Sequence, residues 1–213
     1  TNHATELLPS WDRSADTYQF TPDGGLLITT IDAGHKRVYR VPSTGGAPTL
    51  LLAEHDNDGV TVSADGHTMV WLRDAADHPP EVYAGVLGSG GVVEARQLSH
   101  VNDALLSHLA LRPAEEFWFS GAICDSVQGF IIKPPQWEPG KTFPAVVLIH
   151  GGPHGAWLDS WYRYNYQMFA ARGFGVIAIN PRGSPGYGHK FGDAVATDWG
   201  GTVSYTHLTL PTI

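Results

Sequence analysis

The chain has 213 residues, and its 21 Asp and Glu outnumber its 13 Lys and Arg, which gives a formal net charge of −8 at pH 7. Nucleic-acid affinity is built from clustered basic side chains, so this balance argues against a nucleic-acid partner. A hydrophobic fraction of 42% indicates a folded core, and the single cysteine, Cys124, excludes an internal disulfide framework and a multi-cysteine zinc site.

No apolar run approaches the ~18 residues of a membrane-spanning helix, so the sequence predicts a soluble protein without a membrane partner. The sequence does not identify the cellular compartment, and we prefer the cytoplasm. The chain begins with Thr1-Asn2-His3-Ala4, which holds neither an initiator methionine nor a signal segment. We therefore expect it to start inside a longer protein.

A repeat occupies the first hundred residues. Residues 20–28 match residues 62–70, and the shared Asp-Gly pair recurs at an offset of 42 residues, as Asp23-Gly24 and Asp65-Gly66. In each copy a Val-Tyr pair follows, and a Gly-Gly pair comes after it. Such glycine-containing pairs form the turns of β-hairpins, so each unit is predicted to hold four short strands.

Four strands in ~40–45 residues is the period of a β-propeller blade, so the first half is predicted to be a partial β-propeller of about two blades. A propeller needs at least ~4 blades to close, which implies further blades upstream of this chain. Two unrelated hairpins in a β-sandwich remain the alternative. An open propeller leaves strand edges unpaired, and the isolated chain is therefore expected to aggregate.

The pattern changes at about residue 113. Strands are predicted over residues 116–119 and 127–133, and two prolines end the second. Residues 144–149 form a continuous apolar run, which is typical of a strand buried on both faces. This strand leads into a glycine-rich loop, His-Gly-Gly-Pro-His-Gly, over residues 150–155.

A helix is predicted after this loop. Ser160 is a suitable cap, and the apolar residues from Trp161 to Phe169 recur at helical spacing. Residues 174–180 are the next buried strand, so strand, helix and strand predict a βαβ unit with parallel strands. A second glycine-rich loop covers residues 181–188, and a further helix is expected over residues 190–199.

No glycine cluster matches a phosphate-binding motif. Gly140-Lys141-Thr142 ends like a Walker A sequence, but Pro135 stands where the first glycine is required. The glycines of residues 183–188 do not spell the dinucleotide-binding pattern, so no cofactor is predicted. His150 and His154 have glycines and a proline between them, which does not fit a helical metal-binding pair, and no metal is predicted.

The loop after residue 149 suits a different chemistry. Glycines directly after a buried strand let main-chain N–H groups approach a substrate oxygen, as an oxyanion hole requires. Pro153 has no N–H, so the donor is expected at Gly152 or at Gly151 before it. A plain tight turn at the end of a strand is the alternative. In α/β-hydrolases one oxyanion donor comes from a loop in this place, often of His-Gly-Gly type.

Three motifs follow one another in the second half. Residues 148–155 read LIHGGPHG, residues 180–188 read NPRGSPGYG, and residues 198–201 read DWGG. In this order and spacing, after propeller-like repeats, they resemble the prolyl oligopeptidase family of serine peptidases, and within it the acylaminoacyl peptidase and dipeptidyl aminopeptidase branch. The resemblance covers about residues 10–201. It implies a β-propeller joined to a C-terminal α/β-hydrolase domain that cleaves oligopeptides with a Ser-Asp-His triad and no cofactor.

The resemblance also bears on single residues. It places an oxyanion N–H on Gly152 and puts His150, Arg182 and Tyr187 in the motifs without assigning them a role. Other branches carry a tyrosine where His150 stands, and we do not expect His150 to be the triad histidine. For Arg182 a buried ion pair and a substrate contact are both open.

The nucleophile of the family is missing from the chain, because no Gly-x-Ser-x-Gly occurs in it. The triad is therefore expected beyond this chain, and the fragment alone is expected to be inactive. Residues 202–213 do not resemble the family and are interpreted as a non-native tail, with a real terminal strand as the alternative. The predicted organisation is incomplete propeller blades over residues 1–112, the N-terminal part of an α/β-hydrolase domain over 113–201, and the tail.

The function predicted from the sequence is therefore that of a serine peptidase fragment that takes oligopeptide substrates. An α/β-hydrolase esterase is the alternative enzyme, because the same oxyanion loop serves esters. A catalytically dead propeller binding module is the alternative from another class. The sequence identifies neither the cleavage preference, nor exopeptidase or endopeptidase action, nor the oligomeric state.

Overall fold

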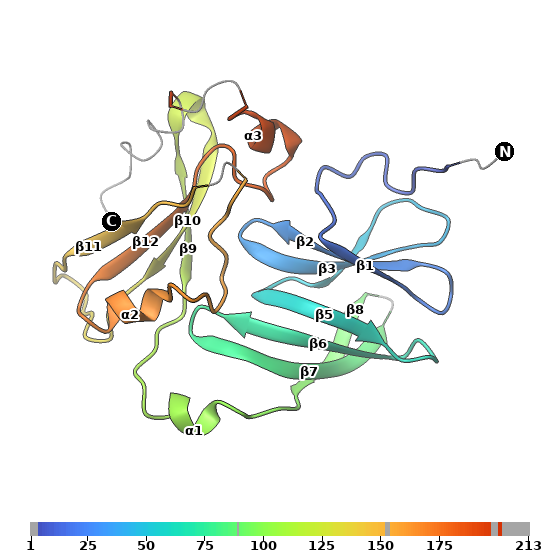
Figure 1. Ribbon diagram of the computed structural model, residues 1–213, viewed down its shortest axis with the longest axis horizontal. Helices are drawn as coiled ribbons and strands as arrows, with labels where there is room; N and C mark the ends of the chain where they lie inside the picture. Colours follow the sequence, from blue (N-terminus) through green and yellow to red (C-terminus); the bar gives the residue numbers. More distant parts are fainter. Residues whose placement is uncertain (1–3, 89, 152–153, 197–199, 202–213) are drawn as a thin grey trace.

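The computed structural model describes residues 4–88, 90–151, 154–196 and 200–201. The N-terminal half forms a large sheet and the C-terminal half a smaller one, and the loops of the two meet in the middle of the molecule (Figure 1). Across the described residues, no helix has both the length and the apolar character that a membrane span needs.

The large sheet consists of two four-stranded antiparallel meanders. A single parallel bridge, Lys36 to Asp56, joins them. The strands of the first meander are β1 (Thr17–Phe20), β2 (Leu26–Asp32), β3 (His35–Val41) and β4 (Thr49–Leu52). Those of the second are β5 (Asp56–Val62), β6 (Thr68–Ala75), β7 (His78–Gly88) and β8 (Gly91–Gln97). Each copy of the repeat thus forms four strands, as the turn pattern predicts.

The Asp-Gly turns of the two copies share one construction. The carboxylates of Asp23 and Asp65 accept hydrogen bonds from the hydroxyls of Thr21 and Ser63, two residues earlier in each case. The glycine that follows has a φ of 83° in the first turn and 77° in the second, a conformation that glycine adopts without strain. Local turn chemistry therefore fixes where each hairpin reverses.

The core of the large sheet lies between its two meanders. The fully buried Trp71 and Met69 of β6 pack with Val38 of β3 and Leu27 of β2. Burial of side chains of this size contributes about 1.5–3 kcal/mol each. The two meanders are therefore held together by their side chains, since only one backbone bridge connects them.

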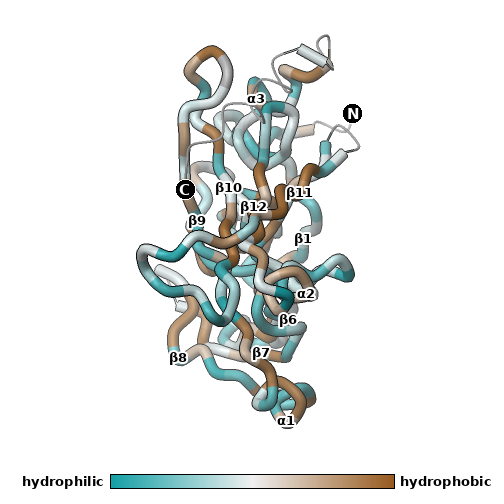
Figure 2. Tube along the Cα trace, turned by 90° about the vertical axis from the view of Figure 1, so that its left-hand side faces the viewer, coloured by the Kyte–Doolittle hydropathy of each residue, from teal (hydrophilic) through white to brown (hydrophobic). Residues whose placement is uncertain are grey.

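The small sheet has the order β11-β12-β10-β9. Its strands are β9 (Glu115–Ser120), β10 (Ser126–Ile132), β11 (Ala145–Leu148) and β12 (Gly175–Asn180). The pair β11 and β12 is parallel, as the predicted βαβ unit requires, and both strands are hydrophobic along most of their length (Figure 2). The helix α2 (Tyr166–Ala170) packs on β10 and β12 over a core that includes Phe130 and Val176.

Short helical turns complete the chain. They are α1 (Asp103–Leu106), between the two sheets in sequence, the 3-10 turn η1 (Ala122–Cys124), between β9 and β10, and α3 (His189–Asp193), after the second glycine-rich loop. The helix predicted over residues 190–199 is therefore shorter where it is described, and residues 197–199 lie outside the described part of the chain.

Two predictions for this half are wrong. The helix does not begin after Ser160: residues 155–164 form no helix, and Asn165 caps α2 by accepting a hydrogen bond from the Gln167 amide at 2.8 Å. The strand β11 is not buried on both faces, and Val147 is 39% exposed. The reason is that β11 is an edge strand of the described sheet and α2 packs on β10 and β12 instead.

Candidate active site

A pocket of about 550 Å³ opens beside the carboxyl end of β11. One wall is the loop that starts at Ile149, and another is the segment of residues 154–165, which carries Trp157, Tyr162 and Tyr164. The large sheet contributes Asp56, at the start of β5. The side chains that line the pocket from the small-sheet half include His150, Trp157, Ser160, Tyr162, Tyr164 and Tyr166.

Of the residues predicted for an oxyanion site, the structure describes Gly151. Gly151 lines the pocket, is exposed to solvent and directly follows His150. Gly152, which the resemblance favours as the donor, lies outside the described residues, and so does Pro153. The predicted role of the Gly152 N–H therefore stays a prediction, while its chain neighbour Gly151 stands at the pocket.

The His150 ring is held from two directions. Its Nε2 lies 3.0 Å from Oγ of Ser184, which belongs to the second glycine-rich loop. The ring also packs edge-on against Trp157, with 6.4 Å between the ring centroids. Trp157 is itself fixed on β11, because its indole N–H donates to the Leu148 carbonyl at 3.0 Å. These contacts bring the LIHGGPHG motif of residues 148–155 and the NPRGSPGYG motif of residues 180–188 together at one end of the small sheet.

The buried side chain of Asn180, at the end of β12, clamps the backbone of Trp157. Its Oδ1 accepts from the Trp157 amide at 2.7 Å, and its Nδ2 donates to the Trp157 carbonyl at 2.9 Å. The same Nδ2 lies 2.8 Å from the Tyr187 hydroxyl. Asn180 is fully buried, so these contacts are shielded from water.

Tyr187 and Arg182, which the sequence leaves without a role, do not line the pocket. The Tyr187 hydroxyl donates to Gln128 of β10, and burial raises its pKa, so the hydroxyl stays protonated as a donor. The Nε of Arg182 lies 3.0 Å from Oδ2 of Asp125, off the line of a hydrogen bond, and the Arg182 side chain is 13% exposed. Arg182 thus makes an ion pair in the structure, which was one of the two alternatives.

The tip of the β2–β3 hairpin reaches from the large sheet into the small one. Its two turn residues, Ala33 and Gly34, have φ of 49° and 73°. The Ala33 carbonyl accepts from the Gln128 side chain at 2.8 Å, and the Ala33 amide donates to the Gly186 carbonyl at 3.1 Å. The Gly34 carbonyl accepts from the Asp159 amide at 2.9 Å. A tight turn of the large sheet is therefore part of the support of the pocket.

Asp159 joins the 154–165 segment to the large sheet a second time. Its carboxylate accepts from the Ala76 amide at 3.0 Å and lies 2.7 Å from Nδ1 of His55. The hydrogen bond with Asp159 raises the pKa of His55. Nearby, the Trp161 amide donates to Asp74 at 3.2 Å, and burial raises the pKa of Asp74 to about 7. Sequence reasoning missed all of these residues, because their partners are far apart in the chain.

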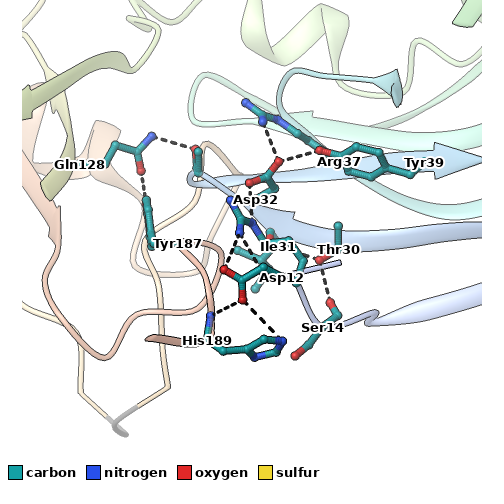
Figure 3. A network of polar contacts seen from close by, with 12 residues as sticks. Asp12, Ser14, Thr30, Ile31, Asp32, Arg37, Tyr39, Gln128, Tyr187 and His189 are labelled. Carbon is teal, nitrogen blue, oxygen red and sulfur yellow. Dashed lines mark hydrogen bonds and ion pairs between the residues drawn. The ribbon is translucent and has the colours of Figure 1, made fainter. Parts of the chain in front are cut away.

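A further polar network connects the N-terminal segment to the second glycine-rich loop. Asp12 accepts from the His189 amide at 2.8 Å, at the start of α3 (Figure 3). Next to it, Arg13 and Arg37 bind the two oxygens of Asp32 at 2.8 Å each, and the Tyr39 hydroxyl donates to the same carboxylate. The contact of Asp12 with His189 thus links the two halves, while the contacts of Asp32 lie within the N-terminal half.

Comparison with known proteins gives consistent matches. The family model described as the prolyl oligopeptidase family matches residues 160–205. The probable dipeptidyl-peptidase 5 of Aspergillus flavus is 33% identical over 205 residues, which are 92% of this chain and 28% of that protein. The dipeptidyl-peptidase 5 of Schizosaccharomyces pombe is 32% identical over 200 residues, again with 28% of its length matched. The chain thus spans little more than a quarter of these relatives.

Solved structures agree with this result. An acylaminoacyl peptidase in complex with Z-Gly-Gly-Phe-chloromethyl ketone is similar with a TM-score of 0.73 and 26% identity, over 88% of this chain and 28% of that one. The acylaminoacyl peptidase of Pyrococcus horikoshii is similar with a TM-score of 0.76 and 24% identity, over 94% of this chain and 30% of that one. The second likeness concerns the fold alone.

Proposed function

Since the chain belongs to the prolyl oligopeptidase family, we propose that it forms part of a serine peptidase that hydrolyses short peptides by acyl transfer. One observation carries this proposal: the glycine loop after β11 opens onto a pocket of about 550 Å³ that is also lined by Asp56 of the large sheet. An oxyanion donor has to lie beside the space where a substrate carbonyl binds, and the position of Gly151 in the lining of the pocket supports the proposal.

We assign the two sheets to the two parts of such an enzyme. The meanders of residues 1–112 are taken as blades of an incomplete β-propeller, and residues 113–201 as the N-terminal part of an α/β-hydrolase domain. Residues 202–213 are taken as a tail that does not belong to it, although the family match extends over the first four of them, to residue 205. The contact of Asp56 with the pocket supports the propeller as a wall that limits substrates to oligopeptides.

In the proposed reaction, main-chain N–H groups at Gly151 and Gly152 stabilise the negative charge that develops on the carbonyl oxygen of the scissile bond. The serine nucleophile of an α/β-hydrolase stands on a sharp turn after a strand, and the acid and the histidine follow it in sequence. We place that strand beside β11, which within the described residues pairs only with β12. The serine then attacks the carbonyl, aided by the histidine as the general base.

The first test is to read the source DNA again past the codon for Gly201. We expect the frame to continue into Gly-x-Ser-x-Gly, followed by an aspartate and a histidine. A fluorophosphonate probe should then label the longer polypeptide and leave the 213-residue chain unlabelled. Stoichiometric labelling of the 213-residue chain would refute the placement of the nucleophile. A frame that stops after Ile213 would favour the binding module without catalysis.

An α/β-hydrolase esterase is the second candidate, since the oxyanion loop itself does not distinguish an ester from an amide. Comparing a dipeptidyl anilide with p-nitrophenyl acetate separates the two. The peptidase proposal expects turnover of the anilide by the active polypeptide. Turnover of the ester alone would support the esterase and contradict the proposal.

A further inference from the structure

The second glycine-rich loop holds one serine, Ser184, whose side chain is fully buried beneath the pocket. We propose that Ser184 is a positioning residue: it binds the His150 imidazole with the ring proton on Nε2 and thereby fixes the peptide of Gly151, which is proposed to bind the oxyanion. This inference rests on the proposed function for its catalytic consequence, while the hydrogen-bond arrangement itself can be measured without any activity.

The direction of the hydrogen bond follows from counting hydrogens. A serine hydroxyl has one hydrogen to donate and two lone pairs to accept with. Oγ of Ser184 lies 2.7 Å from the Pro181 carbonyl oxygen, which can only accept, so the hydroxyl hydrogen points there. At the contact with His150, 3.0 Å long, Ser184 must then accept, and Nε2 of His150 carries the donated proton.

Ser184 is itself fixed in place. Its amide donates to the Pro181 carbonyl at 3.0 Å, which closes a turn, and the neighbouring Gly183 amide donates to the Phe191 carbonyl of α3 at 2.9 Å. The turn begins directly after Asn180, the buried clamp of Trp157. The serine therefore presents its lone pair from a rigid support, as a positioning group requires.

The orientation of the His150 ring is transmitted to the oxyanion loop by close packing. A Cβ added to Gly155 would lie 2.7 Å from the Gly151 carbonyl oxygen and 3.3 Å from Nδ1 of His150. The backbone at Gly155 thus packs closely against both the His150 ring and the Gly151 peptide. Because the peptide of Gly151 adjoins His150, a ring that turns away from Ser184 moves the peptide that is proposed to bind the oxyanion.

This arrangement gives the motif of residues 180–188 a structural role that its sequence does not reveal. Asn180 fixes the segment that follows the oxyanion loop, and Ser184 fixes the residue that precedes it. The Nε2 of His150 is committed to Ser184, so this atom is not available to take a proton from a nucleophile. His150 thus supports the loop.

The proposal is tested on the polypeptide at the length that the source DNA establishes. Long-range ¹H–¹⁵N correlation spectra identify which ring nitrogen of His150 is protonated. We expect the Nε2–H form in the wild type, and a mixture of ring forms in Ser184→Ala, where the acceptor is lost. Ser107→Ala is the matched control, since the Ser107 hydroxyl donates to the Ala104 carbonyl in an exposed turn, and it should leave the His150 signals unchanged.

Activity provides the second readout. With a dipeptidyl anilide, Ser184→Ala should lower kcat about tenfold and leave KM within about twofold, because a displaced oxyanion donor weakens binding of the transition state. Ser184→Cys keeps the shape of the side chain with weaker hydrogen bonding, so it serves if the alanine variant does not fold, and should shift the ring signals in the same direction.

The outcomes separate the two claims. A wild-type spectrum with Nε2 unprotonated overturns the inference, and so does a serine variant that keeps both the ring form and kcat. If the ring form changes in the variants but no wild-type peptidase activity is found, the arrangement of Ser184 and His150 stands and the proposed function fails.

Discussion

Replacing Asp159 tests how the large sheet supports the pocket. Asp159 is 7% exposed, and its carboxylate accepts from the Ala76 amide and binds His55 of the large sheet. Asp159→Ala removes both contacts and leaves the Ala76 N–H buried without an acceptor. Asp159→Asn keeps an oxygen for Ala76 and loses only the charge beside His55.

The magnitudes differ between the two variants. An unsatisfied buried N–H costs about 1–3 kcal/mol, and a partly exposed ion pair adds about 0.5–1 kcal/mol. We therefore expect Asp159→Ala to lower the free energy of unfolding by about 1.5–4 kcal/mol at about pH 6. Asp159→Asn should lower it by about 1 kcal/mol, because only the contact with His55 is weakened.

The loss in Asp159→Asn should depend on pH in a defined direction. The pKa of folded His55 is raised above its usual value near 6.5, so the contribution of the pair is fully present below about pH 6.5. It disappears as the pH rises through the pKa of the folded state. Urea unfolding followed by tryptophan fluorescence at about pH 6 and pH 9 measures this. Equal losses at the two values, or an alanine variant as stable as the wild type, would refute the reasoning.

Two other substitutions have clear expected effects. Gly34→Ala should lower the free energy of unfolding by about 2–4 kcal/mol in urea titrations, because φ is +73° and the new Cβ would lie 2.6 Å from Oε1 of Gln128. Its control is Gly90→Ala, where nothing lies within 4 Å and no change is expected. Asp74→Asn should raise the free energy of unfolding by about 1–2 kcal/mol at about pH 8 and leave it unchanged near pH 4, because the pKa of about 7 means that the folded state resists ionisation of Asp74. A loss at pH 8 would contradict this.

Features set by neighbouring residues could be predicted from the sequence. The Asp-Gly turns of the repeat place both the hydroxyl that binds the aspartate and the glycine with positive φ within a few residues. The hairpins therefore follow from local chemistry, and so does the glycine loop after β11. The parallel pairing of β11 with β12 also follows, because a short crossover with a helix permits little else.

The 154–165 segment shows why the rest could not be predicted. Its apolar spacing suggests a helix from Ser160, but its amides find distant partners: the Trp157 amide binds Asn180, the Asp159 amide binds Gly34, and the Trp161 amide binds Asp74. A backbone whose donors are satisfied from elsewhere gains nothing from helical hydrogen bonds. Partners separated by tens of residues leave no local pattern.

The contacts of this segment with the large sheet divide into two kinds. The bonds to His55 and Asp74 involve groups whose pKa values are raised in the folded state, and both pKa shifts lower the free energy of unfolding as the pH rises toward 8. The bond from the Asp159 amide to the Gly34 carbonyl does not titrate. At high pH the segment therefore keeps its backbone anchor at the hairpin tip while its contact with His55 weakens, and the bond from the Trp161 amide persists because it favours the ionised form of Asp74.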